Sequence, residues 1–332
     1  MMRMEEKIVS FVTGANGFVG SHLVDYLLEL GQEVHAIVRP TSNLQWLEGK
    51  PVKLHTCGLN EAEALKKAFV GAHYIYHIAG VVKVPTEADF MRGNVDMTKN
   101  VLEAAVSIPT IKRVLVTSSM AATGFAPYGG SVNEEDPLRP IEPYGNSKVA
   151  QEKVTFEYAD RVPVTIVRPP GVYGPRDTEI FAFFKAIKGG VSAMMGFKPK
   201  EMSLIHVRDL VQGMYLAATN EESIGEVYFL GSLKCYNWKE LGEIASKAMN
   251  KKTITLRIPH FVIFILGFFG QIAESWFKAD VALNKDRAYR ITRPSWYCSS
   301  EKAVRELGFE QTVSIDDGFK STIAWYQEKG WL

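Results

Sequence analysis

The first half of the chain alternates short apolar runs with segments of helical spacing, and this alternation constrains the fold more than any other feature. Apolar runs predict buried strands at 8–13, 34–38, 52–56, 74–78, 114–117 and 164–167. Between them, helices are expected at 18–30, 61–70 and 95–106, with a further helix from Tyr144. Strands joined through helices run parallel, and parallel sheets are buried on both faces, as strands that are apolar throughout require. The sequence therefore predicts an α/β protein with a doubly wound parallel sheet.

A glycine-rich loop joins the first predicted strand to the first predicted helix, in the sequence Thr13-Gly14-Ala-Asn-Gly17-Phe-Val-Gly20. Glycines at such a junction permit a tight turn and a close approach of the backbone to a pyrophosphate at the helix N-terminus. The spacing is G-x-x-G-x-x-G rather than G-x-G-x-x-G, and three glycines are also compatible with a plain turn. The strand–loop–helix context favours a dinucleotide-binding site.

The second predicted strand ends at Val38-Arg39-Pro40. An acidic residue at this point would bind the ribose 2′-hydroxyl of NAD, whereas an arginine pairs with the 2′-phosphate of NADP. Arg39 therefore predicts NADP(H) rather than NAD(H), with an ordinary surface arginine as the alternative. Ser42 and Asn43 can either bind the same phosphate or form the turn that follows.

Tyr144 and Lys148 lie four residues apart, after a proline that suits the first position of a helix. On a helix, residues at this spacing share one face. A phenol beside an ammonium is expected to be acidified, because the positive charge favours the phenolate. The pair thus predicts a proton donor and acceptor near neutral pH, although the same spacing also occurs on solvated helix faces.

Together, the glycine loop, Thr117-Ser-Ser119 and Tyr144-x-x-x-Lys148 resemble the extended short-chain dehydrogenase/reductases, the NAD-dependent epimerase/dehydratase group. The resemblance covers nearly the whole chain, including 168–175 and 206–210, and implies a Rossmann-type fold. The segments 38–44 and 325–331 are most similar to the dihydroflavonol-reductase-like branch, which includes 3β-hydroxysteroid-dehydrogenase-like members.

The resemblance also implies residue roles. Tyr144 matches the general acid/base, and Lys148 matches the residue that lowers its pKa and holds the nicotinamide ribose. Ser119, rather than Ser118, matches the hydroxyl that orients the substrate oxygen. The positions that match the cofactor-binding segments are Gly14, Asn16, Gly17, Phe18, Val19, Gly20, Arg39, Leu59, Ala79, Gly80, Lys148, Pro169, Gly171 and Val172.

The chain departs from the family pattern after the third strand, where Cys57-Gly58-Leu59 replaces a common Gly-Asp-Leu with an Asp near the adenine. Adenine recognition is then expected to rely on backbone and apolar contacts. His73 and His77 have a metal-ligand spacing for a helix, but they flank a predicted strand and are interpreted as structural. Asn94 is interpreted as the cap of the following helix, with a proton relay as the alternative.

After Pro175 the alternation weakens. Helices are expected at 181–187 and 207–219, strands at 202–206 and 225–230, and mainly helices from Trp238 onward. We interpret 1–175 as an NADP-binding Rossmann domain to which 207–232 returns. The segments 176–206 and 233–332 then form a smaller, mainly helical substrate-binding region.

Composition limits the partners. A net charge of +1 without a dense basic run argues against nucleic acid, and no metal site is expected. Three scattered cysteines suit a reducing compartment, so a cytoplasmic location is predicted. The apolar segment 261–269 is too short to span a bilayer and is interpreted chiefly as core. Membrane-surface contact through 259–278 is a lesser alternative, and a homodimer is expected from the resemblance.

These inferences predict an NADP(H)-dependent oxidoreductase that interconverts a ketone or aldehyde and a secondary alcohol on a hydrophobic small molecule. Fold and catalytic triad do not separate this activity from that of a nucleotide-sugar epimerase or dehydratase. An epimerase needs a cationic clamp for a diphosphate, for which Lys198, Lys200 and Arg208 are the candidates. A non-catalytic NADPH-sensing protein is the alternative of another class.

Overall fold

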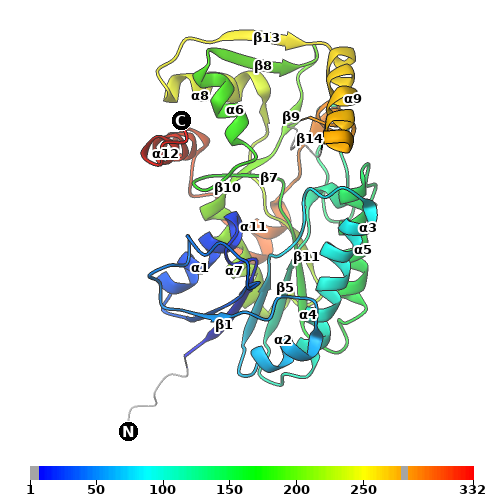
Figure 1. Ribbon diagram of the computed structural model, residues 1–332, viewed down its shortest axis with the longest axis vertical. Coiled ribbons are helices and arrows are strands. Elements are labelled where there is room, and N and C mark those ends of the chain that lie inside the picture. The colour runs from blue at the N-terminus through cyan, green and yellow to red at the C-terminus, as the bar shows by residue number, and fades with distance from the viewer. Residues whose placement is uncertain (1–6, 278–282) are drawn as a thin grey trace.

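The centre of the computed structural model, which describes residues 7–277 and 283–332, is a seven-stranded parallel sheet (Figure 1). Its strand order is β11-β6-β5-β4-β1-β2-β3. The strands are β1 (Val9–Thr13), β2 (Glu33–Ile37), β3 (Val52–His55), β4 (Tyr74–His77), β5 (Arg113–Thr117), β6 (Val164–Arg168) and β11 (Val227–Phe229). The predicted α/β, doubly wound fold is confirmed.

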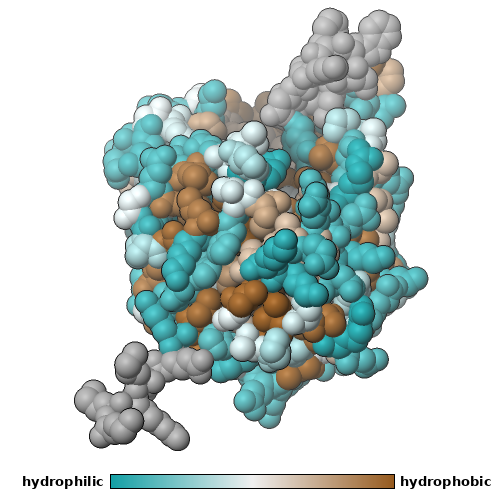
Figure 2. Space-filling view, turned by 60° about the horizontal axis from the view of Figure 1, so that its bottom comes forward, coloured by the Kyte–Doolittle hydropathy of each residue, from teal (hydrophilic) through white to brown (hydrophobic). Residues whose placement is uncertain are grey.

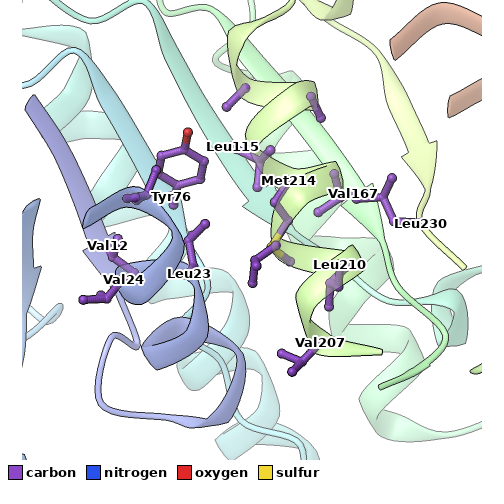
Figure 3. Close-up of a cluster of buried hydrophobic side chains, with 14 of the residues drawn as sticks. Val12, Leu23, Val24, Tyr76, Leu115, Val167, Val207, Leu210, Met214 and Leu230 are labelled. Carbon is purple, nitrogen blue, oxygen red and sulfur yellow. The ribbon is translucent and has the colours of Figure 1, made fainter. Parts of the chain in front are cut away.

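Helices cover both faces of this sheet and divide its core into two layers. On one face lie α1 (Phe18–Glu29) and α7 (Val207–Thr219), and on the other lie α2 (Ala62–Ala68), α4 (Met97–Val106) and α5 (Pro143–Phe156). Figure 3 shows the first layer, in which Leu23 of α1 and Met214 of α7 meet Val12 and Tyr76 of the sheet.

Neighbouring residues of one strand belong to opposite layers, because successive side chains of a strand point to opposite faces. Val12 and Tyr76 face the layer of α1 and α7, whereas Phe11 and Ile75 face the layer of α2 and α4. All four are fully buried. A strand with apolar neighbours on both faces must be apolar at every position, which explains the uninterrupted runs in the sequence.

The strand order reverses direction between β1 and β4. The chain builds β1, β2 and β3 toward one edge and then returns to place β4 on the other side of β1. Thr13, the last residue of β1, pairs with His77, the last residue of β4. Loops that leave these two carboxyl ends therefore diverge at a topological switch point, where ligands of such sheets bind.

The remaining elements form a smaller region at the end of the molecule away from residue 7 (Figure 1). Its short strands form three small sheets, in the orders β10-β7, β12-β9-β14 and β13-β8. The strands are β7 (Gly171–Tyr173), β8 (Val191–Met195), β9 (Glu201–Met202), β10 (Leu204–His206), β12 (Tyr236–Asn237), β13 (Ile254–Ile258) and β14 (Ser295–Trp296). The helices are α6 (Phe181–Lys188), α8 (Trp238–Ala248), α9 (His260–Phe277), α10 (Lys285–Ile291) and α12 (Ile315–Glu328), while α11 (Glu301–Leu307) packs beside α7 and β11.

Several segments differ from the sequence-based expectation, and strand β8 was not expected at all. The helix expected to begin at Val95 is preceded by α3 (Glu87–Phe90) and a π-helical turn over Met91–Asp96, which continue directly into α4. The strand β13 lies where mainly helices were expected. Among the residues that the structure describes, no helix is both long and apolar enough to cross a bilayer.

Candidate active site

Apart from Tyr144 and Lys148 on α5, the predicted site residues lie in segments that follow the carboxyl ends of strands in the parallel sheet. Parallel strands point in one direction, so these segments meet at one edge of the sheet. The positions are the Gly14–Gly20 loop after β1, Arg39 after β2, Leu59 after β3, Ala79 and Gly80 after β4, Ser119 after β5, Pro169 after β6, and Gly171 and Val172 on β7.

Two glycines of the first loop are required by close backbone packing. Gly14 has φ +69°, and a Cβ there would lie 2.8 Å from the backbone nitrogen of Ala79. A Cβ at Gly20 would lie 2.1 Å from the carbonyl oxygen of Gly14. Any larger side chain would push the start of α1 away from the loop, or push the loops after β1 and β4 apart.

The N-terminus of α1 is free to bind an anion. Gly17 occupies the N-cap position, and no side chain of the described residues caps this helix. The first-turn N–H groups of Phe18 and Val19 therefore point out of a helix end that carries a partial positive charge. The donors present fit the pyrophosphate of a dinucleotide, which binds at such a helix end.

Tyr144 lies in the first turn of α5, where Pro143 begins the helix as expected. The Ser119 hydroxyl, which follows β5, lies close enough to the Tyr144 phenol on α5 to lower its pKa. The Nζ atom of Lys148 lies 5.8 Å from the centroid of the Tyr144 ring, and the Phe90 ring lies 5.9 Å from it. The structure thus brings the three predicted catalytic residues together.

The expected acidification of Tyr144 is wrong for the protein alone. Burial raises the pKa of Tyr144 above its ordinary value, and the neighbouring Ser119 hydroxyl and the charge of Arg290 lower it only in part. Burial also lowers the pKa of Lys148, to about 8. The ammonium is turned toward other partners, because Nζ donates to the Thr117 carbonyl and to Gln151 Oε1, both at 2.9 Å.

Gln151 continues this contact into a buried hydrogen-bond chain. Its Oε1 accepts from Lys148, and its Nε2 donates to Thr98 Oγ1 at 2.8 Å. Both Gln151 and Thr98 are completely buried. Because an amide has a donor and an acceptor in a fixed arrangement, the chain holds the lysine nitrogen in one place.

The chain extends from Thr98 to the glycine loop, and its proton directions can be assigned. The Thr98 hydroxyl donates to the Asn94 carbonyl at 2.6 Å, so His77 Nε2, at 2.8 Å, must donate to Thr98. A neutral His77 then accepts from Thr13 Oγ1 through Nδ1 at 2.8 Å. Burial lowers the pKa of His77 to about 3, which keeps it neutral. Thr13 Oγ1 in turn accepts from the Ala79 backbone N–H at 3.2 Å.

His73 also has a structural role, because its Nδ1 accepts the backbone N–H of Val9 at 3.0 Å. Both histidines are thus engaged with the sheet, as predicted. Across residues 7–277 and 283–332, no group of three or more His, Cys, Asp or Glu is arranged to hold a metal ion.

The interpretation of Asn94 as a helix cap is wrong. Asn94 lies inside the π-helical turn and is buried. Its side chain accepts from the Val81 backbone N–H at 2.8 Å and donates to the Val81 carbonyl at 3.0 Å and to Ser147 Oγ at 2.9 Å. It therefore fixes the segment after β4 against α5. Gly80 is required here, since a Cβ would lie 2.8 Å from Asn94 Oδ1 and 3.4 Å from Lys148 Nζ.

Ser118 and Ser119 have different partners. The Ser118 hydroxyl donates to Glu152 Oε1 at 2.5 Å, and this buried carboxylate forms a bidentate pair with Arg168, at 2.8 Å and 2.7 Å. Ser119 instead contacts Tyr144 and caps the short turn that follows, accepting from the Ala121 backbone N–H at 3.1 Å. The geometry therefore favours Ser119 as the hydroxyl beside the phenol.

Arg39 is exposed, and its guanidinium has no ion-pair or hydrogen-bond partner among the residues described. It is therefore available to a phosphate. Ser42 and Asn43 serve the turn, because Ser42 Oγ accepts the Arg39 N–H and Asn43 Oδ1 accepts the Gln45 N–H, both at 3.0 Å. Leu59 packs in the core, and its carbonyl accepts from Asn100 Nδ2 at 3.0 Å.

Three features of the site were not found in the sequence. Gln151 could have been found, because it lies three residues after Lys148 on the same helix. Phe90 was missed because α3, the short helix that it ends, has no clear helical pattern in the sequence. Arg290 forms an ion pair with Glu142 at 3.0 Å, but the two are far apart in the chain and no local pattern links them.

Comparison with known proteins agrees with this geometry. The sequence model of the NAD dependent epimerase/dehydratase family matches residues 10–231. The chain is 27% identical over 336 residues to the ceramide reductase of Caulobacter vibrioides, covering 100% of this chain and 98% of the relative. It is 30% identical over 318 residues to the 4-hydroxy-2-methyl-3-oxo-4-farnesyl-3,4-dihydroquinoline-1-oxide ketoreductase of Stigmatella aurantiaca, covering 93% and 94%.

The relatives include dihydroflavonol-reductase-like and 3β-hydroxysteroid-dehydrogenase-like members, as the sequence predicted. Among solved structures, UDP-glucose 4-epimerase from Thermotoga maritima with UDP-glucose superimposes with a TM-score of 0.80 at 21% identity. The match covers 97% of this chain and 99% of that one. At this identity the likeness describes the fold.

Proposed function

The chain belongs to the NAD-dependent epimerase/dehydratase family, and from this premise we propose that it is an NADP(H)-dependent oxidoreductase that interconverts a ketone or aldehyde and a secondary alcohol on a hydrophobic molecule. The observation that carries the proposal is the cluster of Ser119, Tyr144 and Lys148 at the carboxyl edge of the sheet. The segment after β4 joins this cluster to the glycine loop.

In the direction of reduction, each of the three residues acts at a defined atom. The cofactor, when bound, supplies hydride transfer to the carbonyl carbon. Tyr144 donates its phenolic proton to the carbonyl oxygen, and the Ser119 hydroxyl hydrogen-bonds the same oxygen as negative charge develops. The ammonium of Lys148 stabilises the phenolate that remains. Oxidation of the alcohol uses the same atoms in reverse.

The preference for NADP(H) rests on Arg39. A 2′-phosphate requires a cation at the end of β2, and an unpaired, exposed guanidinium there loses no existing interaction when it binds one. Selectivity for NAD would require a carboxylate at this point to accept a hydrogen bond from the ribose 2′-hydroxyl. The sequence Val38-Arg39-Pro40 contains none.

A hydrophobic substrate is favoured over a nucleotide sugar because two of the three candidate cations for a diphosphate have other polar partners. Lys200 is buried, and its Nζ donates to the carbonyl oxygens of Thr292 and Arg293. Arg208 pairs with Glu29 at 3.7 Å, at the end of α1 away from the glycine loop. Lys198 lies over the Tyr128 ring and is the only one of the three without a polar partner in the described residues.

The two relatives named above carry names of reductases acting on lipid-like molecules, a ceramide and a farnesylated quinoline. These names support a hydrophobic ketone or alcohol as the substrate class. The homodimer and the cytoplasmic location remain predictions from the sequence.

The test replaces Tyr144 by Phe. The variant should lose at least about 10²-fold in turnover, the lower end of what a positioned acid/base contributes, and should retain NADPH binding. Wild-type and variant proteins are titrated with NADPH by fluorescence and then assayed with a panel of hydrophobic ketones and UDP-sugars.

Two outcomes would contradict the proposal. One is a wild-type-like rate in the Tyr144→Phe variant, which would exclude Tyr144 as the proton donor. The other is interconversion of a UDP-sugar without net NADPH consumption, which would establish the epimerase activity instead. A matched control, Tyr128→Phe, removes an exposed phenol outside the triad and should leave the rate unchanged.

A further inference from the structure

Helix α9 exposes an unusual amount of apolar side chain. Its exposed residues are Phe261 (65%), Phe264 (41%), Ile265 (51%), Leu266 (52%), Phe268 (47%) and Phe269 (62%). The interpretation of 261–269 as core is therefore wrong for these positions. On the face shown in Figure 2, hydrophobic side chains lie in groups among hydrophilic ones, as on an ordinary protein surface. Six large exposed apolar residues within three helical turns instead mark a binding surface.

The packing of α9 needs only a narrow stripe of the helix. Ile263 is buried, and Gly267 and Gly270 approach α10 and the residues before it. A Cβ at Gly267 would lie 2.7 Å from the Cβ of Ala288, and a Cβ at Gly270 would overlap the carbonyl oxygen of Leu283. These three residues recur at spacings of four and three and so form one face. The exposed apolar residues of α9 lie mainly outside this face.

The strand before α9 also exposes apolar side chains. In β13, Ile254 is 78% exposed and Leu256 53% exposed, and alternate residues of a strand share one face. Val191 of β8, the cross-strand partner of Ile254, is also exposed. The opposite face of this small sheet is used for packing, because a Cβ at Gly242 of α8 would overlap Ser192 Oγ.

The charge of β13, α9 and the residues around them indicates which kind of surface they can bind. From residue 251 to the end of α9 the chain contains Lys251, Lys252 and Arg257 and a single acidic residue, Glu274 in the last turn of the helix, in a chain whose net charge is only +1. Lys285 of α10 adds a cation, with Nζ 5.1 Å from the centroid of the Phe268 ring. An apolar helix edged by cations, and too short to cross a bilayer, has the composition of a helix that lies in the interface of an anionic membrane.

The surface is joined to the catalytic helix through one short helix. α10 packs against α9, and its Arg290 forms the ion pair with Glu142, the N-cap residue of α5. Tyr144 follows two residues later. A protein that rests on a membrane through α9 would therefore hold the N-terminal end of its catalytic helix close to the lipid.

We propose that α9 and β13 dock on the surface of an anionic membrane, and that the substrate is a lipid alcohol or ketone resident in it. The statement about the substrate rests on the proposed function, whereas docking does not. Of the segment 259–278, Lys278 lies outside the described residues. The docking surface is defined here by Ile254, Leu256, Phe261, Ile265 and Phe269.

The test measures co-sedimentation of the full chain with vesicles of phosphatidylcholine and phosphatidylglycerol (3:1) and of phosphatidylcholine alone. The wild type is compared with Phe261→Ser/Phe269→Ser, which removes two of the most exposed rings. The control is Val70→Ser/Ile224→Ser, which removes two exposed apolar side chains, 72% and 50% exposed, outside the docking surface. Turnover of a water-soluble ketone and the oligomeric state by light scattering are measured for all three proteins.

We expect the wild type and the control to bind the anionic vesicles. The α9 variant should bind at least about tenfold more weakly, because it lacks two rings that the membrane would bury. Binding should weaken with added salt and on vesicles of phosphatidylcholine alone. Equal binding by the wild type and the α9 variant, or no binding by either, would overturn docking. So would an α9 variant that only loses self-association, because α9 would then join two copies of the chain.

The ketone assay separates the two proposals. Intact vesicle binding without turnover of any ketone would leave docking in place and refute the oxidoreductase. Unchanged ketone turnover in the α9 variant, together with lost activity on a ketone embedded in vesicles, would support both.

Discussion

The buried pair of Glu152 and Arg168 should hold the catalytic helix to the sheet, and its loss should be costly. Glu152 lies on α5, one turn after Lys148, and Arg168 ends β6. Their side chains are 3% and 4% exposed, and two hydrogen bonds of 2.8 Å and 2.7 Å join them. Replacing Glu152 by Leu leaves a buried guanidinium without its counter-charge and removes the acceptor of the Ser118 hydroxyl.

The expected loss follows from that geometry. Removing one partner of a buried ion pair costs about 3–5 kcal/mol of unfolding free energy, because the remaining charge has no compensation. The upper part of this range is expected, since Arg168 Nη1 already lacks a partner within the described part of the chain. Glu152→Leu/Arg168→Met removes both charges and should recover at least half of the loss, because no uncompensated charge remains.

Urea unfolding followed by circular dichroism measures these differences. Glu243→Leu is the control, because Glu243 pairs with Lys239 on an exposed helix face, with side chains 67% and 62% exposed, and should change stability by only about 0.5 kcal/mol. A loss below about 1 kcal/mol in Glu152→Leu would refute the reasoning. A double variant no more stable than the single one would refute it as well.

Two further predictions concern the cofactor and the lysine. Arg39→Ser should weaken NADPH binding about 10–100-fold and leave NADH binding unchanged, because only the charge-assisted contact to the 2′-phosphate is lost; equal weakening of both in fluorescence titrations would contradict this. The pKa of Lys148 is about 8, so its ammonium, and with it kcat/KM, should decline as pH rises through that value. Gln151→Glu should move this decline to higher pH and Gln151→Leu to lower pH, because a carboxylate stabilises the ammonium and a hydrocarbon does not; identical pH profiles for both variants would show that Gln151 does not position the lysine.

The parallel sheet was predictable because its signal is local and strong. Each strand is a short run of apolar residues, and each of the predicted strands is found within one or two residues of its expected position. The helix over 207–219 was predicted with its observed bounds, because its apolar residues recur at helical spacing. The glycine loop could also be predicted, because no side chain fits at Gly14 or Gly20 and the glycines are therefore visible in the sequence.

The parts that were missed depend on packing between distant segments. β13 reads Ile-Thr-Leu-Arg-Ile, an alternating pattern that was overlooked because helices dominate around it. Its outer face is exposed, so no uninterrupted apolar run marked it. Asn94 lies in a π-helical turn whose extra residue cannot be read from spacing, and its partner Ser147 is far along the chain. The apolar residues of α9 were assigned to the core because hydropathy alone does not show which face of a helix is covered.

The pKa of Tyr144 shows how far a motif can be interpreted without a structure. The four-residue spacing from Lys148 was expected to favour the phenolate, but spacing does not say where the ammonium points. In the folded chain Nζ is bound to Thr117 and Gln151, and burial of the phenol outweighs the charges around it.

The protein alone therefore keeps Tyr144 protonated at neutral pH, because its pKa lies above the ordinary value of a phenol. A protonated phenol beside the Ser119 hydroxyl can donate its proton, as reduction of a carbonyl requires. Oxidation of an alcohol requires the opposite state, in which the proton has left and Lys148 stabilises the phenolate. In the protein alone these side chains thus leave Tyr144 in the protonation state that carbonyl reduction uses, and in the proposed reaction Lys148 stabilises the phenolate after proton transfer.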